Sequence, residues 1–245
     1  MKVFIDSADV DEIKKYLSWG VCDGVTTNPV IFQKCGVTGG FEAMKKRTLE
    51  IARLIFPRPM NVEVVSEDPQ EILNQAREYS TWADNIVVKI TITDRKGNSF
   101  LPLIHQLVSE GVQVNVTTIT TFNQSIFAAK AIEAGYKENP NAEKPCFISI
   151  FCGRISDEHG FEISVEVLRN FRQWLDFHKM DGIEIIAASI RSPESVEFWS
   201  RTGAHVLTIP LDPMSKVLSS ARTKETVAEF IDTSKKILEE IKKQP

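Results

Sequence analysis

Residues 85–91 read NIVVKIT, a stretch that predicts a β-strand covered on both faces. Its apolar residues follow one another with a single interruption, which is typical of a strand in a parallel sheet. The interruption is Lys89, and lysine is among the residues least often fully buried. The stretch therefore indicates a parallel α/β fold and singles out Lys89 as a residue whose position needs a chemical reason.

Seven further runs of β-branched and apolar residues occur along the chain. These predicted strands are KVFID (2–6), GVTT (24–27), NVEVV (61–65), VQVNVT (112–117), CFISI (146–150), IEIIAAS (183–189) and HVLTI (205–209).

Segments with helically spaced apolar residues lie between the strands. The predicted helices are residues 8–20, 40–55, 69–83, 100–111, 122–135 and 164–177, with a last one at 223–243. We expect Ser7 to cap the first helix, and Gly111 and Gly135 to end the helices that they follow. The polar stretch from Glu133 to Pro145 is interpreted as a surface loop.

Eight strands that alternate with helices predict a single (β/α)8 TIM barrel over residues 1–245, with residues 223–243 as an extra C-terminal helix. A doubly wound open sheet is the alternative. It is disfavoured because no glycine-rich phosphate loop follows the first strand. No linker or low-complexity tract divides the chain, so we expect one domain.

Composition narrows the class of protein. The net charge of −4 argues against a nucleic-acid-binding face. Four cysteines without a CxxC pair and four scattered histidines favour reduced thiols in the cytoplasm over a metal site or disulfides. No apolar run is long enough to span a membrane, and the first fifteen residues carry too many charges for a signal peptide. We expect a cytoplasmic protein that needs no metal and no cofactor.

Polar side chains lie in or just after seven of the eight predicted strands. They are Asp6, Thr26, Thr27, Asn28, Glu63, Lys89, Asn115, Thr117, Ser149, Arg154, Ser189 and Arg191. Each has a simple structural explanation on its own, such as a helix cap for Asp6, a turn at Asn28 or a lysine that extends to the barrel rim. Their coincidence at the end of the barrel where active sites occur favours a functional site.

The chemistry of these residues indicates imine catalysis. Apolar neighbours deprive Lys89 of hydration, which disfavours the ammonium form. A neutral amine can attack a ketone and form a Schiff base, and the iminium then permits cleavage of a neighbouring carbon–carbon bond. Asp6 and Glu63 are the carboxylates available for proton transfer. Hydrogen bonds to sugar hydroxyls are predicted from Asn28, Asn115, Thr117 and Ser149, and charge-assisted bonds to an anionic tail from Arg154 and Arg191.

Six motifs together resemble the small-subunit transaldolases and fructose-6-phosphate aldolases. They are FIDSADVDEI (4–13), GVTTNP (24–29), NIVVKI (85–90), VNVTTITTFNQSIFAAKA (114–131), SIFCGRISD (149–157) and IEIIAASIRSP (183–193). The resemblance runs from Lys2 to about Leu218 and implies a (β/α)8 barrel with Lys89 as the Schiff-base lysine.

The same resemblance implies roles for the surrounding residues. It implies that Asp6 is the acid/base for carbon–carbon cleavage, and that Glu63 and Thr117 hold the water used in imine chemistry. The sugar site would include Thr27, Asn28, Asn115, Ser149 and Phe151. The anionic tail would be bound by Arg154, Ser189 and Arg191.

Two positions separate the branches of the family that the chain resembles. Glu63 and Phe151 match the transferases, whereas the aldolase branch carries glutamine and tyrosine there. The resemblance therefore implies transfer of a dihydroxyacetone unit from an anionic ketose to glyceraldehyde 3-phosphate. Ile150 and Ser192 depart from the usual proline and histidine, so the tail is expected to be a phosphate or, as in 6-deoxy-6-sulfofructose, a sulfonate.

Three alternatives differ in what they require of the sequence. An aldolase-type lyase acting on fructose 6-phosphate would release dihydroxyacetone without an acceptor. A non-catalytic sugar-phosphate-binding protein would not need Lys89 in a buried strand. A metal-dependent aldolase would need histidine or carboxylate clusters at the strand ends.

The resemblance also concerns assembly. The family joins its subunits through the C-terminal helix, which implies a homo-oligomer, a pentamer or decamer. The partners of the chain would then be further copies of itself and small ketose and aldose phosphates or sulfonates.

Overall fold

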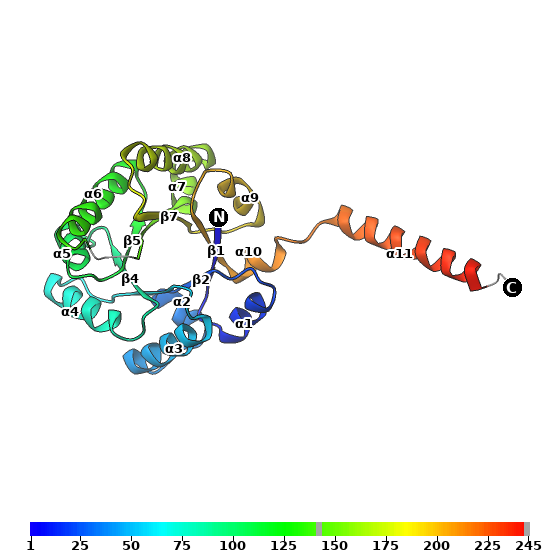
Figure 1. Ribbon diagram of the computed structural model, residues 1–245, viewed down its shortest axis with the longest axis horizontal. Coiled ribbons are helices and arrows are strands. Elements are labelled where there is room, and N and C mark those ends of the chain that lie inside the picture. Colours follow the sequence, from blue (N-terminus) through cyan, green and yellow to red (C-terminus); the bar gives the residue numbers. More distant parts are fainter. Residues whose placement is uncertain (141–143, 243–245) are drawn as a thin grey trace.

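The computed structural model describes residues 1–140 and 144–242, in which eight strands close into a barrel (Figure 1). Neighbouring strands pair in parallel all round the barrel, and β1 closes it by pairing with β8. The strands are β1 (Lys2–Asp6), β2 (Gly24–Thr26), β3 (Met60–Glu63), β4 (Ile86–Thr91), β5 (Val114–Ile119), β6 (Cys146–Phe151), β7 (Ile183–Ala188) and β8 (Val206–Pro210). The predicted (β/α)8 TIM barrel with an extra C-terminal helix is confirmed.

Helices surround the barrel, and one more extends away from it (Figure 1). They are α1 (Val10–Ser18), α2 (Pro29–Lys34), α3 (Gly40–Ile55), α4 (Pro69–Ser80), α5 (Leu101–Ser109), α6 (Phe122–Glu138), α7 (Cys152–His159), α8 (Phe161–His178), α9 (Pro193–Ser200), α10 (Leu211–Lys216) and α11 (Ala221–Lys242). None of the helices in this described part of the chain combines the length and hydropathy that a membrane crossing requires.

Three local predictions need correction or refinement. Asp9, not Ser7, caps α1, because its carboxylate accepts from the backbone N–H groups of the first turn. Helix α6 continues through Gly135, where a side chain would collide with Val108 of α5, so this glycine allows two helices to pack closely. The loop predicted after it starts only beyond Glu138, and its residues 141–143 lie outside the described residues. Gly111 follows α5 in a left-handed conformation, as a helix-ending glycine does.

The barrel interior has an apolar layer beneath a polar layer. Because side chains alternate along a strand, residues two positions apart point to the same side. Phe4, Val87, Phe147 and Val206 form part of one apolar cluster, whereas Val88 belongs to the core between strands and helices. Each of these four apolar residues of the interior is followed two positions later, nearer the C-terminal mouth, by a polar residue. These polar residues are Asp6, Lys89, Ser149 and Thr208. The interior is therefore packed below and polar above.

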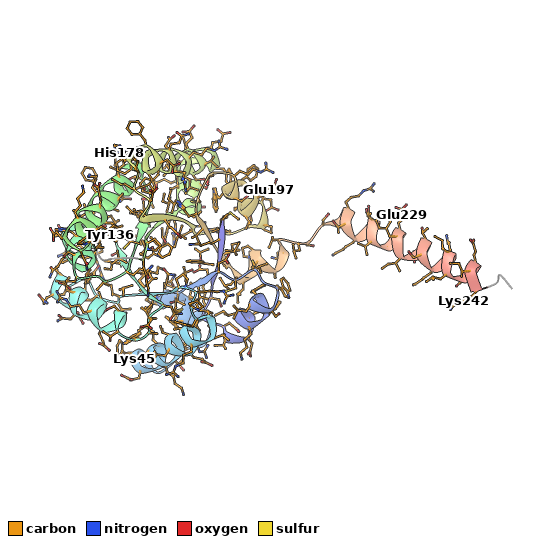
Figure 2. The ribbon with its side chains drawn as sticks, viewed as in Figure 1. Lys45, Tyr136, His178, Glu197, Glu229 and Lys242 are labelled. Carbon is orange, nitrogen blue, oxygen red and sulfur yellow. The ribbon has the colours of Figure 1, made fainter. Side chains whose placement is uncertain are left out.

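Helix α11 leaves the barrel and makes no buried contact with it. Figure 2 shows the helix, with Glu229 and Lys242 labelled on it, extending away from the rest of the molecule. No side chain of α11 is buried. Its exposed large apolar residues are Val227, Phe230, Ile231, Ile237, Leu238 and Ile241. The predicted helix at 223–243 thus forms from residue 221 to 242, and Lys243 lies outside the described residues.

Candidate active site

The polar layer opens into a cavity of about 520 Å³ at the C-terminal mouth of the barrel. Strand ends and the segments that follow them supply its walls. The predicted site residues that line it are Asp6, Asn28, Glu63, Lys89, Thr117, Ser149, Phe151, Arg154, Ser189 and Arg191. Thr27 and Asn115 are fully buried and do not line it. Thr26, which the sequence also singles out at a strand end, lines the cavity as well. The structure therefore brings eleven of these thirteen residues to one cavity, and Thr27 and Asn115 lie behind its wall.

Lys89 is held at the base of this cavity by two oxygen partners. Its ammonium donates to the carbonyl oxygen of Thr27 at 2.8 Å and lies 3.1 Å from Glu63 Oε2. Its side chain is 6% exposed. Glu63 is opposite Lys89 in the register of β3 and β4, so strand pairing itself brings the carboxylate and the amine together. An ammonium in an apolar strand is tolerated because its end meets polar groups.

Asp6, the last residue of β1, lines the same cavity and receives a hydrogen bond from Thr26. Thr26 Oγ1 donates to Asp6 Oδ1 at 2.6 Å, and Thr26 is also hydrogen-bonded to the hydroxyl of Thr208. Burial raises the pKa of the Asp6 carboxyl above its ordinary value, while the Lys89 ammonium and the Thr26 hydroxyl each offset part of that rise. A carboxyl with a raised pKa can both accept and return a proton, as an acid/base must.

Thr117 presents a hydroxyl with unused hydrogen-bonding capacity. Its Oγ1 is buried and has no hydrogen-bond partner among the described residues. Buried polar atoms are nearly always paired, so an unpaired one beside a cavity indicates a bound water or ligand group. The strand is irregular here, because pairing of β5 with β6 shifts between Val116 and Ile119 and Thr118 adopts a φ of 63°. Such irregularities are common beside active sites, where they redirect side chains.

Ser149 and Asn115 belong to a buried hydrogen-bonded chain. Ser149 Oγ donates to Asn115 Oδ1 at 2.8 Å, and Asn115 Nδ2 donates to Asn61 Oδ1 at 2.9 Å. Asn61 Nδ2 in turn donates to the carbonyl oxygen of Val25 at 3.1 Å. Ser149 is the member of this chain that lines the cavity.

The two arginines of the site are exposed at the mouth of the cavity. Arg154 comes from α7, and Arg191 follows β7 and pairs with both carboxylate oxygens of Asp157 at 2.5 and 2.8 Å. Ser189 has a φ of 64°, unusual for a residue other than glycine. Gly153 lies against its carbonyl oxygen so closely that a Cβ there would be 2.0 Å away. The glycine before Arg154 is therefore required for the two segments to meet.

Asn28 has a structural role beside its place in the wall. Its side-chain oxygen accepts from the N–H of Ile31 and so caps the short helix α2, whose last residue, Lys34, also lines the cavity. Thr208 and Lys34 are cavity residues that the sequence analysis missed. Thr208 was detectable, because it lies two residues beyond an inward-facing valine in the eighth strand.

Another concavity of the described structure shares no lining residue with the active-site cavity. A groove of about 870 Å³ follows α3 on the outer helical layer, where Lys45 is labelled in Figure 2. Its polar lining residues are mostly exposed side chains of one helix. Within residues 1–140 and 144–242, no three histidine, cysteine or acidic residues are placed to hold a metal ion.

Comparison with known proteins places the chain among relatives. Residues 3–245 match the sequence profile described as Transaldolase/Fructose-6-phosphate aldolase. The chain belongs to this family. A protein named "Probable transaldolase" from Dehalococcoides mccartyi is 33% identical over 235 residues, which cover 94% of this chain and 96% of the relative. One with the same name from Streptococcus agalactiae serotype V is 35% identical over 231 residues, which cover 94% of this chain and 96% of the relative.

The family assignment agrees with likeness in fold. A solved structure described as "Native KDPGal structure" aligns with a TM-score of 0.50 at 14% identity, covering 97% of this chain and 95% of that one. At that identity the likeness concerns the barrel alone. The membership of the transaldolase/fructose-6-phosphate aldolase family expected from the motifs is thus confirmed, and it rests on similarity along almost the whole chain.

Proposed function

We propose that this family member is a transaldolase that moves a dihydroxyacetone unit from an anionic ketose to glyceraldehyde 3-phosphate through an imine on Lys89. The observation that carries the proposal is the place of Lys89, a buried amine at the base of a cavity with a carboxylate 3.1 Å away. The names of the relatives support transaldolase chemistry in general. The substrates and the covalent step are our inference from the site.

Imine formation uses the pair at β3 and β4. Glu63 is close enough to take the proton that Lys89 must lose before its nitrogen attacks the ketose carbonyl carbon. The carbinolamine then loses its oxygen as water, for which Glu63 supplies a carboxyl and Thr117 an unused hydroxyl. The same water position serves the hydrolysis that later frees the product.

Cleavage uses Asp6. Its carboxylate removes the proton of the hydroxyl on the carbon to be released, the carbon–carbon bond breaks, and its electron pair moves into the iminium to give an enamine. The aldehyde leaves and an acceptor aldose takes its place. The enamine carbon attacks the acceptor carbonyl, and Asp6 returns the proton to the new alkoxide. Ser149 and Asn28, which line the cavity, would contact sugar hydroxyls, and Arg154, Ser189 and Arg191, which line it too, would bind the anionic tail.

The charged tail belongs to the donor ketose, either 6-deoxy-6-sulfofructose, with glyceraldehyde 3-phosphate as acceptor, or fructose 6-phosphate. Cleavage of fructose 6-phosphate itself yields glyceraldehyde 3-phosphate, so net transfer from that donor needs another acceptor, such as erythrose 4-phosphate. Both donors suit a mouth that carries two arginine side chains, because each ends in a tetrahedral group with several acceptor oxygens. In the described structure Arg191 already shares its charge with Asp157. An incoming tail would therefore compete with the Asp157 carboxylate for Arg191, which is one of the two arginines proposed to bind the tail.

An acceptor-dependence assay tests this function against the lyase alternative. The purified chain is given 6-deoxy-6-sulfofructose with glyceraldehyde 3-phosphate, or fructose 6-phosphate with erythrose 4-phosphate, and the products are measured by mass spectrometry. We expect a new ketose phosphate only when the acceptor is present and little free dihydroxyacetone without it. Rapid release of dihydroxyacetone without acceptor would identify a lyase, and no conversion in either mixture would favour a binding protein.

Phe151 gives the same assay a second use. It is the last residue of β6 and lines the same cavity as Lys89. Replacing Phe151 with tyrosine adds a phenol that can donate a proton to the enamine. Phe151→Tyr should therefore raise the release of free dihydroxyacetone relative to transfer.

We further propose that the chain assembles into a homo-oligomer through α11. Helix α11 exposes six large apolar side chains and buries none on its own barrel. An apolar stripe of this length in water is unfavourable, at roughly 25 cal/mol for each Å² left uncovered. Covering it with another copy, in a ring such as a pentamer or a decamer made of two rings, removes that cost.

A further inference from the structure

Asn61 is a fully buried asparagine of β3 for which the mechanism above has no use. Its backbone carbonyl and both polar atoms of its side chain are hydrogen-bonded to residues of β2, of the segment that follows β2, and of β5. Its backbone carbonyl accepts from both the N–H and the hydroxyl of Thr27, at 3.0 and 2.8 Å. Its side chain joins Val25 of β2 to Asn115 of β5, although the residue itself does not line the cavity.

The direction of the chain of hydrogen bonds is set at the end farthest from the cavity. A backbone carbonyl can only accept, so the atom of Asn61 that faces Val25 O at 3.1 Å must be the Nδ2 donor. Asn61 Oδ1 must then face Asn115 and accept from its Nδ2. That leaves Asn115 Oδ1 facing Ser149, whose single hydroxyl proton is used to reach it.

Ser149 therefore presents lone pairs, and no proton, to the cavity. It is 2% exposed and lines the cavity wall. A ligand group that meets Ser149 must itself donate a hydrogen bond, as a sugar hydroxyl does. A methyl group, a ketone oxygen or a phosphate oxygen at that point would leave the serine oxygen without its partner or face it with a second acceptor.

We propose that Asn61 is a positioning residue that fixes Ser149 as a hydrogen-bond acceptor, and so makes the enzyme select donor ketoses with a free hydroxyl next to the carbonyl carbon. The proposal rests on the function proposed above, in which such a ketose is bound to Lys89. It goes beyond that function because Asn61 touches no substrate and acts through Asn115 and Ser149.

Removing the Asn61 amide should leave the orientation of the Asn115 amide, and with it that of the Ser149 hydroxyl, no longer fixed. In Asn61→Leu, the amide of Asn115 no longer has an oxygen to face, so either of its ends can turn toward Ser149. When Nδ2 faces Ser149, the serine proton is free to point into the cavity. In Asn61→Ser, a hydroxyl can still donate to Val25 O and accept from Asn115, which should keep the original direction in part.

The kinetic test compares two donors of similar size, fructose 6-phosphate and 1-deoxy-1-fluorofructose 6-phosphate, with erythrose 4-phosphate as acceptor. The hydroxyl on the first carbon can donate to Ser149, whereas fluorine at that place cannot donate and so pairs only with a serine that directs its proton into the cavity. The unaltered chain should prefer the first in kcat/KM by about tenfold or more, the effect of one buried hydrogen bond and its unpaired partner. In Asn61→Leu the preference should fall to within about threefold of unity, and Asn61→Ser should recover most of it. A preference unchanged in Asn61→Leu would overturn the proposal.

Asn85 supplies a matched control. It is another buried asparagine beside the same sheet, and its Nδ2 donates to the carbonyl oxygens of Ala52 and Arg58 at 2.9 and 2.7 Å. Asn85→Leu removes comparable hydrogen bonds far from Ser149. It should lower thermal stability and leave the preference between the two donors unchanged. Equal losses of preference in Asn85→Leu and Asn61→Leu would mean that Asn61 acts only through stability, which would also overturn the proposal.

A neutron crystal structure of the unaltered, deuterium-exchanged chain decides the matter independently of turnover. We expect the Ser149 deuteron to point at Asn115 Oδ1 and both deuterons of Asn61 Nδ2 to lie on the side of Val25 O and away from Asn115. A Ser149 deuteron directed into the cavity would contradict the proposal even if the enzyme is a transaldolase. The expected deuteron positions in a chain that converts no ketose would support the acceptor site and reject the proposed function instead.

Discussion

Glu63 Oε2 and Lys89 Nζ lie 3.1 Å apart because their residues are paired in the parallel register of β3 and β4. The pair is only slightly exposed, at 18% and 6% of the two side chains. Removing one partner of a buried ion pair is strongly destabilising, whereas replacing both partners with apolar residues often costs no stability. Stability alone therefore does not explain why the fold has an ion pair here. This arrangement agrees with a lysine that must be held in one position beside a carboxylate.

Thr26→Val should move the pH dependence of turnover. Thr26 donates to Asp6 at 2.6 Å, and this hydrogen bond lowers the pKa of Asp6, against the larger rise caused by burial. Without it the carboxylate form is less stable, so the acidic limb of kcat/KM should shift to higher pH. Thr27→Val is the matched control, because the Thr27 hydroxyl donates to Asn61 O and not to Asp6. A shift of equal size in both variants would show that Thr26 does not act on Asp6.

Asp6→Asn should make the folded protein more stable at neutral pH while it abolishes turnover. Burial raises the pKa of Asp6 above its ordinary value of 3.8, so between the two values the folded state holds a proton that the unfolded state has lost. Stability then falls as the pH rises through that window. Asparagine removes this penalty and can still accept from Thr26.

Denaturant unfolding of both proteins across the acidic range measures the effect. The variant should exceed the unaltered chain in free energy of unfolding at pH 7, and the difference should shrink as the pH falls below the raised pKa. A variant that is less stable at pH 7 would mean that the ionised Asp6 is a net contributor to the fold.

Substitutions of Arg191 and Asp157 should change kcat/KM for an anionic ketose in opposite directions. Arg191→Ala should lower kcat/KM for an anionic ketose by about 10- to 100-fold, as expected from losing a charge-assisted hydrogen bond, and affect neutral fructose much less. Asp157→Asn removes the competing carboxylate. Both side chains of this pair are about half exposed, at 49% and 55%, so the gain should be modest. We expect up to about fivefold, the worth of a surface ion pair.

Parallel measurements on fructose 6-phosphate, 6-deoxy-6-sulfofructose and fructose separate these effects. Equal losses on all three donors in Arg191→Ala would assign the arginine to the fold and not to the tail. Unchanged rates in Asp157→Asn with charged donors would show that the ion pair does not compete with the substrate.

The sequence predicted the barrel and most of the cavity because apolar strands alternate with helices and polar residues stand out in or just after those strands. Val87 and Lys89 are two residues apart on one strand, as are Phe4 and Asp6, so an apolar interior layer beneath a polar one follows from the pattern alone. Thr208 obeys the same rule but was missed, because a threonine within a strand is also explained by β propensity.

Other features depend on contacts that no local pattern reports. Asn115 is predicted as a cavity residue, but its amide is covered by Asn61 and Ser149 from two other strands. The pairing of Arg191 with Asp157 joins the segment after β7 to α7. The shortest helices, such as α2 and α10 with six residues each, span under two turns. They are too short for a helical spacing of apolar residues to be recognised in the sequence.

Removal of α11 should dissolve the proposed oligomer. A chain that ends at Ser220 lacks all six exposed apolar residues of the helix, and because none of them is buried on the barrel the remaining domain should stay folded. Light scattering should give an oligomer for the full chain and a monomer for the shortened one, with similar circular dichroism per residue of the barrel. A full chain that is monomeric at micromolar concentration would rule out assembly through α11.

The most direct test of the account is to trap the covalent intermediate on Lys89. The chain is incubated with fructose 6-phosphate or 6-deoxy-6-sulfofructose, reduced with borohydride, digested and mapped by mass spectrometry. We expect a three-carbon adduct on Lys89, and none in a folded Lys89→Met variant. Lys34 is the sharpest competitor, since it lines the same cavity. An adduct on Lys34, or turnover that continues in Lys89→Met, would contradict the central claim.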